Sequence, residues 1–126
     1  MEKKYYVCEH CGNIVTKLND SGVPLMCCGQ KMKELEAGVT DAALEKHVPV
    51  ARPEGDKVYV EIGAAIHPMV EEHYIQWIAL HTEKGVQIKY LKPEEAPKAV
   101  FTVEEGDKAV AVYEYCNLHG LWKAEL

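Results

Sequence analysis

The chain has 126 residues, of which 48% are hydrophobic and 27% charged, and its formal net charge at pH 7 is −6. This composition excludes a disordered chain, and the absence of any apolar run of about 18 residues excludes a membrane-spanning helix. An acidic chain without a basic patch also lacks the surface that displaces counterions from nucleic acid. An anionic substrate would need local positive charge near its site.

The first six residues, Met1 to Tyr6, lack the apolar stretch of a secretory signal, so we expect a cytoplasmic protein. The five cysteines are odd in number, and Cys27 and Cys28 are adjacent. In a reducing compartment, cysteines clustered in this way are more often metal ligands than disulfide partners.

Residues 1–36 are predicted to form a small module, with strand signals at 4–7 and 13–18. So short a segment cannot bury enough apolar surface to fold unaided, and it therefore needs a metal to hold it together. Four thiolates can supply that site, since the metal-knuckle pair Cys8 and Cys11 is followed by Cys27 and Cys28. Tetrahedral thiolate sites hold zinc or iron, and the spacing does not choose between them.

Residues 37–126 are predicted to form a second domain, reached through a linker over 36–45 that has room for one helical turn. Short β-runs with turn residues between them follow, at 57–62, 74–80, 86–91, 99–103, 109–115 and 121–124. About seven short strands and almost no helix predict an antiparallel β-sandwich of immunoglobulin type. The fold class is therefore all-β, a small metal-stapled module followed by a β-sandwich.

A second set of metal ligands is predicted in this domain. It consists of four histidines and one cysteine at strand ends or in loops: His47, His67, His73, Cys116 and His119. These are one ligand too many for the tetrahedral shell of structural zinc, but they suit a five-coordinate iron with an open sixth position. Copper is the weaker interpretation, because no methionine follows Cys116 and the surplus imidazoles would have no role.

A thiolate on such an iron pushes electron density toward the ligand opposite, as in thiolate-ligated haem. The ligand set therefore indicates a redox enzyme that acts on a small oxygen species. Two other classes stay open at this point: an electron carrier with two saturated irons, and a structural zinc-ribbon module.

Several longer motifs make the chain similar to a known family. Tyr6-Val-Cys-Glu-His-Cys-Gly-Asn-Ile-Val15 and Cys27-Cys-Gly29 resemble the desulforedoxin module. The motifs that resemble the catalytic module are Asp41-Ala-Ala-Leu-Glu-Lys-His-Val-Pro49, His67-Pro-Met69, Glu72-His-Tyr-Ile75 and Cys116-Asn-Leu-His-Gly-Leu-Trp-Lys123. Over essentially its whole length the chain resembles desulfoferrodoxin, the two-iron superoxide reductase family.

The resemblance implies iron at both sites: centre I as Fe(Cys)4, and centre II with four histidines in a plane and Cys116 axial. It implies the reaction of superoxide with one electron and two protons to give hydrogen peroxide. It also implies rubredoxin as the usual electron donor and a homodimer.

Two charged residues beside His47 are candidate catalytic groups. Lys46 can supply the local positive charge that an anion needs on an acidic protein. The resemblance assigns Glu45 to the sixth position of the resting ferric iron. Glu114, two residues before Cys116 on the predicted strand, is a candidate for supporting that ligand, and the peptide N–H groups of Leu118 and His119 are candidate donors to its sulfur.

Overall fold

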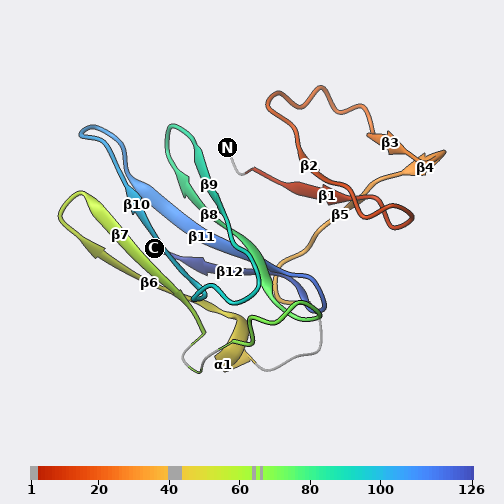
Figure 1. The fold of residues 1–126 in the computed structure, drawn as a ribbon. Coiled ribbons are helices and arrows are strands. Elements are labelled where there is room, and N and C mark those ends of the chain that lie inside the picture. Colours follow the sequence, from red (N-terminus) through yellow and green to blue (C-terminus); the bar gives the residue numbers. More distant parts are fainter. Residues whose placement is uncertain (1–2, 40–43, 64, 66) are drawn as a thin grey trace. The chain divides into compact units, whose positions relative to one another are not determined.

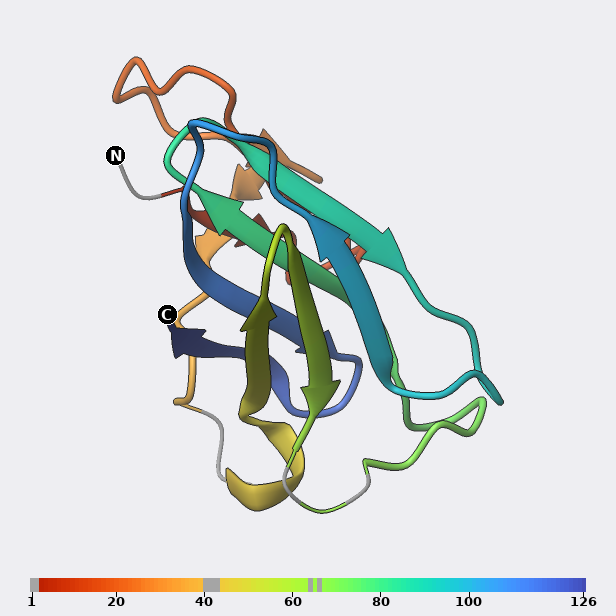
Figure 2. The ribbon, with the colours of Figure 1, turned by 90° about the vertical axis from the view of Figure 1, so that its left-hand side faces the viewer.

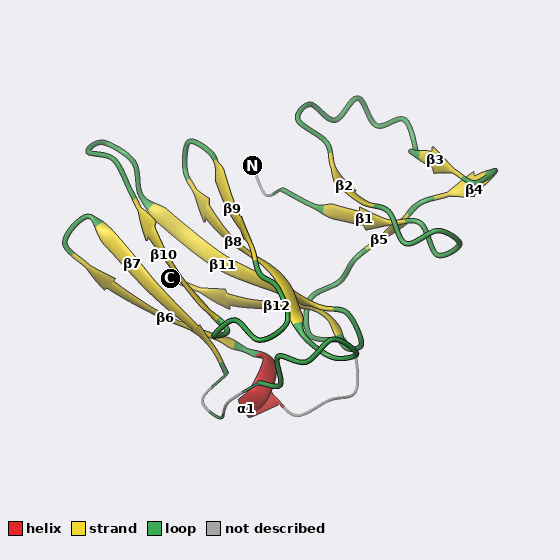
Figure 3. Cartoon of the chain, in the orientation of Figure 1, coloured by secondary structure: helices red, strands yellow, loops and turns green. Residues whose placement is uncertain are grey.

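The structure is a computed structural model of the chain, and it describes residues 3–39, 44–63, 65 and 67–126, without the side chains of Leu44 and Glu45. The chain divides into two compact units, Met1–Glu36 and Ala37–Leu126. All its sheets are antiparallel (Figures 1 and 3), and the one α-helix among the described residues is a single turn. The all-β prediction is confirmed.

Unit 1 consists of five short strands. The order in its three-stranded sheet is β2-β1-β5, and the remaining two strands form a hairpin; their bounds are β1 (Tyr5–Val7), β2 (Ile14–Thr16), β3 (Met26–Cys27), β4 (Gln30–Lys31) and β5 (Lys33–Glu34). The two residues between β3 and β4 both have positive φ, 51° at Cys28 and 73° at Gly29. This is the backbone that a tight hairpin requires, and it is uncommon for a residue other than glycine.

Unit 2 is a sandwich of two sheets, with strand orders β10-β7-β6 and β12-β11-β8-β9 (Figure 2). Its elements are α1 (Leu44–His47), β6 (Pro49–Glu54), β7 (Lys57–Ile62), β8 (Ile75–Thr82), β9 (Val86–Tyr90), β10 (Lys98–Thr102), β11 (Ala109–Cys116) and β12 (Gly120–Glu125). The core between the sheets contains Ile62, Ile75, Leu80, Phe101 and Val112. Burying this apolar set is the main stabilising contribution to the unit.

One strand of the sandwich, β6, was absent from the sequence prediction. It contains Pro49 and Pro53, and proline is excluded from central strands because it cannot donate a ladder hydrogen bond. β6 pairs only with β7 and is an edge strand, so the two prolines are tolerated there.

Trp77 is buried on β8. On β8 the core cluster contains Ile78 and Leu80, at positions alternate to Trp77, and Ile75, which lies beyond a register shift. Trp77 instead stacks on Tyr115 of β11, with ring centroids 5.7 Å apart and planes inclined by 9°. Successive side chains of a strand point to opposite faces, which places this aromatic pair on the other face of the sheet.

Candidate metal centres

The four cysteines of unit 1 lie together, with every pair of sulfur atoms within 4.8 Å. Sγ of Cys11 is 3.6 Å from Sγ of Cys27, which is in turn 4.0 Å from Sγ of Cys28. Two local features build the group: the knuckle, in which the Cys11 amide donates to Cys8 Sγ at 3.4 Å, and the β3–β4 hairpin, which presents its two cysteines from adjacent positions.

The hydrogen bonds and pKa values of these thiols favour the binding of a cation among them. The backbone N–H of Cys11 lowers the pKa of Cys8 to about 6, while the side-chain hydrogen bond with Cys11 raises the pKa of Cys28 to about 12. One thiolate is therefore stabilised and further ionisation is opposed by its neighbours. A metal ion removes that opposition, because thiolates bound to it are neutralised.

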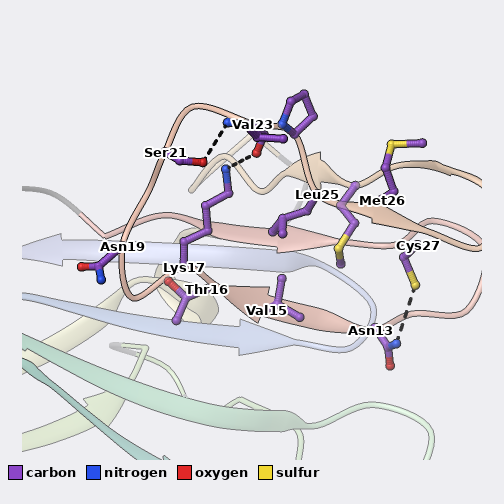
Figure 4. A pocket seen from close by; sticks show the side chains of 12 residues that line it. Asn13, Val15, Thr16, Lys17, Asn19, Ser21, Val23, Leu25, Met26 and Cys27 are labelled. Atoms are coloured by element: carbon purple, nitrogen blue, oxygen red, sulfur yellow. Dashed lines mark hydrogen bonds between the residues drawn. The ribbon is translucent and has the colours of Figure 1, made fainter.

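A hollow of about 550 Å3 lies beside this cluster (Figure 4). Its wall includes Leu25 and Met32, and at the edge nearest the metal group the Asn13 amide donates to Cys27 Sγ at 3.7 Å. Lys17, which also lines the hollow, donates a hydrogen bond from its ammonium group to the Val23 carbonyl at 2.8 Å. Lys17 thus holds the loop between β2 and β3, and Asn13 joins the start of β2 to Cys27.

The four histidines of unit 2 form a closed square of imidazole rings. Successive ring centroids are 4.6, 4.7, 4.9 and 4.8 Å apart in the order His47, His67, His73, His119, and neighbouring rings are inclined by 76° to 88°. The diagonal pair His47 and His73 is 6.4 Å apart with planes inclined by only 26°. The rings thus alternate in orientation around the square, and ligand atoms of His47, His67 and His73 lie within 4.8 Å of one another.

The distances between these nitrogens fit a square of ligands. His47 Nε2 lies 3.0 Å from His119 Nδ1 and 3.1 Å from His67 Nε2. With metal–nitrogen bonds of about 2.1 Å, ligands at right angles are about 3.0 Å apart and tetrahedral ligands about 3.4 Å. His47 therefore has the nitrogen spacing to His67 and His119 of ligands at right angles rather than of a zinc tetrahedron.

Cys116 completes the group, with its sulfur 3.9 Å from His119 Nδ1 and within 4.8 Å of ligand atoms of the other three histidines. At this strand end the register of β11 and β8 shifts, and β8 carries the extra residue, Gln76. Such bulges are frequent next to functional sites. Burial raises the pKa of the Cys116 thiol, and backbone N–H groups of Leu118 and His119 counteract this, so the expected donors to the sulfur are present.

The protonation of the histidines also suits a metal. Burial lowers the pKa of His67 to about 4, so its ring is neutral at pH 7. Its Nδ1 lies 2.6 Å from the Pro68 carbonyl, which can only accept, so Nδ1 carries the proton and Nε2 keeps the lone pair. Burial lowers the pKa of His73 as well. Neutral imidazole is the form that ligates metals.

Comparisons with known proteins agree with this arrangement. Residues 39–125 match the desulfoferrodoxin family, and residues 1–35 match the desulfoferrodoxin N-terminal domain. A desulfoferrodoxin homolog of Archaeoglobus fulgidus is 49% identical over 119 residues, 94% of each chain, and the desulfoferrodoxin of Nitratidesulfovibrio vulgaris is 49% identical over 120 residues, 95% of this chain and 94% of that one. The chain belongs to the desulfoferrodoxin family.

The fold of the chain is also similar to that of solved superoxide reductase structures. The superoxide reductase from Treponema pallidum superposes with a TM-score of 0.83 at 34% identity, covering 99% of this chain and 100% of that one. The one-iron superoxide reductase from Giardia intestinalis covers 65% of this chain and 99% of its own length, with a TM-score of 0.54 and 35% identity.

The other three candidate residues of the sequence analysis lie in two elements, Lys46 and Glu45 in α1 and Glu114 in β11. Lys46 is exposed in α1, directly before His47, and its charge contributes to lowering the pKa of His73. Glu45 lies in the same turn, but its side chain is outside the described part of the structure. Glu114 is fully buried; burial raises its pKa to about 9, and neither carboxyl oxygen has a hydrogen-bond partner among the described residues.

Two residues near the square were missed in the sequence. The Trp122 ring lies 5.0 Å from His47, and its Nε1–H donates to the His119 carbonyl at 3.0 Å. Asn117 binds the main chain on both sides of His73. Both stand inside or beside the Cys116–His119 motif, and this adjacency is the sequence signal that could have identified them.

Proposed function

We propose that this chain is a superoxide reductase that uses iron at both centres and reduces superoxide to hydrogen peroxide at centre II. The observation that carries the proposal is the square of four imidazoles with the Cys116 thiol beside it. Five donors leave one position of an octahedron for a small ligand. The relatives described as superoxide reductases support the choice of substrate.

The donor sets fit iron at both places. Four thiols in unit 1 match an Fe(Cys)4 centre from Cys8, Cys11, Cys27 and Cys28. In unit 2 the ligands would be His47, His67, His73, His119 and Cys116. When bound there, ferrous iron would supply the single electron that the reduction needs.

The residues around centre II have separable tasks. Cys116 would hold the metal and donate electron density to it, tempered by the N–H groups of Leu118 and His119. His47 and His67 are buried, while His73 and His119 are only partly buried, which favours approach of a small anion from their side. Lys46 would attract that anion, because its charge acts on His73.

Glu45 is proposed as the residue that competes for the open coordination position after turnover, because it belongs to the same helical turn as Lys46 and His47. Its assignment rests on the resemblance of the 41–49 motif to the family. Glu114 is proposed to support Cys116 as a buried carboxyl two residues earlier on β11.

We further propose a cytoplasmic homodimer that receives electrons from a rubredoxin-type donor. The clustering of the five cysteines into two groups of candidate metal ligands fits a reducing compartment. Among the described residues, no helix is long and apolar enough to cross a bilayer. Sedimentation velocity tests the dimer, and mixing the oxidised protein with reduced rubredoxin tests the donor.

The decisive experiment combines metal analysis, the visible spectrum and product stoichiometry. We expect two irons per chain, an Fe(Cys)4 spectrum from centre I, and a ferric thiolate band from centre II. Pulse-generated superoxide should yield one hydrogen peroxide per superoxide consumed, without dioxygen, when a reductant is present. A yield of one peroxide per two superoxides, with dioxygen, would indicate a dismutase, and zinc at both centres would refute the proposal.

A further inference from the structure

Asn117 stands between two of the proposed ligands, Cys116 and His119, and its side chain crosses to another loop. Its Oδ1 accepts a hydrogen bond from the Tyr74 amide at 2.9 Å, and its Nδ2 donates to the Glu72 carbonyl at 2.9 Å. Its own amide donates to the Tyr74 carbonyl at 3.3 Å. Three hydrogen bonds thus join one residue to the two neighbours of His73.

These contacts are not the usual use of asparagine in a turn. In that use the side chain binds its own backbone about two residues away. Here the partners are 43 and 45 residues distant in the sequence, so the bonds connect the loop before β8 to the turn between β11 and β12. Both loops lie at the α1 end of the sandwich (Figures 1 and 2).

His73 depends on such support more than His67 and His119 do. The His67 ring is oriented by its own hydrogen bond to Pro68, and the main chain of His119 is held by Trp122. The Nε2 atom of His73 is buried without a hydrogen-bond partner among the described residues, while its main chain exchanges two hydrogen bonds of 3.0 Å with Val70. The hydrogen bonds that the structure shows at His73 are therefore bonds of its backbone, and Asn117 binds that backbone on both sides.

We propose that Asn117 is a positioning residue for His73, which ties the loop of that imidazole to the loop of the Cys116 thiolate. The inference deepens the proposed function, because it rests on the ligand set proposed for centre II. Its chemistry requires one acceptor and one donor at the same distance from the backbone, which only an amide supplies. Aspartate keeps the acceptor for Tyr74 but directs a second oxygen at the Glu72 carbonyl.

The test measures how fast iron leaves centre II of the full-length, iron-loaded protein in excess chelator, followed at the ferric thiolate band. Loss of a group that orients a metal ligand typically weakens metal binding about 10- to 100-fold. We expect Asn117→Ala to release iron faster by about that factor, with a shifted band, and Asn117→Asp to change in the same direction. Should the alanine variant fail to fold, the aspartate variant carries the test.

Gln87→Ala is the matched control. It also removes a side-chain hydrogen bond to the main chain, of 2.8 Å to the Thr102 carbonyl, but on β9, where no proposed ligand lies. We expect it to release iron at the parent rate and to keep the parent band. Faster iron loss in this control would show that any lost hydrogen bond loosens the site, and would overturn the assignment.

A double-mutant cycle separates positioning of His73 from general support of the loops. If Asn117 acts through His73, the double variant His73→Ala with Asn117→Ala should lose iron no faster than His73→Ala alone. Parent-rate iron loss in Asn117→Ala, or independent multiplication of the two effects, would overturn the inference. Because metal retention is measured, a failure to react with superoxide would refute the proposed function and leave this result standing.

Discussion

The two metal groups of this chain are built in opposite ways. In unit 1 all four ligands come from one stretch, Cys8 to Cys28, and the buried hydrophobic residues that the structure describes there are Tyr5 and Cys8. In unit 2 the proposed ligands extend from His47 to His119 and lie at the end of a sandwich with its own apolar core. The metal is expected to organise the first unit, whereas the fold organises the second site.

The two units also differ in net charge. The first 36 residues contain five lysines and five acidic residues, so the whole net charge of −6 belongs to residues 37–126. The proposed substrate is an anion, and it would react in the unit that repels it at long range. Positive charge close to centre II is therefore needed to attract the anion, whereas centre I needs no such charge.

The largest expected effect is that of removing the thiolate from the site that the fold builds. Cys116→Ser should abolish the ferric thiolate band and nearly all superoxide reduction, yet leave the sandwich folded, because its core does not depend on the metal. Visible spectra, pulse radiolysis and tryptophan fluorescence check this, since both tryptophans lie in unit 2. Near-normal turnover would show that the sulfur is dispensable.

Removing one ligand from the metal-organised unit should have a different result. Cys28→Ser should eliminate or alter the centre I spectrum and increase hydrogen exchange throughout residues 3–36, because few apolar contacts remain to hold them. The rapid reaction of reduced centre II with superoxide should persist. If that reaction disappears while centre II keeps its iron, the two units are not independent in the chemical step.

Local charge at centre II gives a smaller effect. Lys46→Ala should slow the second-order reaction with superoxide about tenfold and flatten its dependence on ionic strength, with iron content unchanged. Lys98→Ala, which removes the same charge from an exposed position at the start of β10, is the matched control. Stopped-flow rates at several salt concentrations compare the two, and equal rates would make Lys46 an ordinary surface charge.

Unit 2 also contains a destabilising feature, a buried carboxyl, whereas the acidic residues described in unit 1 are exposed. The pKa of Glu114 is about 9 in the folded protein and about 4.5 unfolded, so between these values the unfolded chain binds fewer protons and stability falls as pH rises. Relative to Glu114→Gln, the parent should lose up to about 1.4 kcal/mol per pH unit between pH 5 and 9.

Urea unfolding followed by tryptophan fluorescence measures this difference, with the exposed Glu104→Gln as control. Parallel pH profiles for the parent and Glu114→Gln would mean that the carboxyl is already ionised in the folded protein.

The smallest expected change is at Glu45. Glu45→Ala should leave the encounter rate with superoxide unaltered, because the carboxylate is proposed to bind only after oxidation, and should shift the spectrum of the resting ferric site. Spectra of the fully oxidised variant across pH, set beside those of Lys46→Ala, distinguish the two roles. A slower encounter in Glu45→Ala would place this residue in substrate approach instead.

Much of unit 2 could be predicted from the chain alone, because alternation over 57–62 and 109–115 and the turns between them are local signals. The prolines of β6 concealed a strand, since only the sheet order shows that it lies at an edge. The strands β3, β4 and β5 are two residues each, too short to give a periodic pattern.

The residue types and spacing alone determined that this chain carries four thiols for one metal and five donors for another, because ligand chemistry resides in side chains. Only the tertiary structure decided that His47, His67, His73 and His119 form a square, since their approach depends on loops at one end of two packed sheets. It also decided the partners of Asn117, which lie more than 40 residues away. Contacts of that range arise from the packing of the sandwich, which no local pattern encodes.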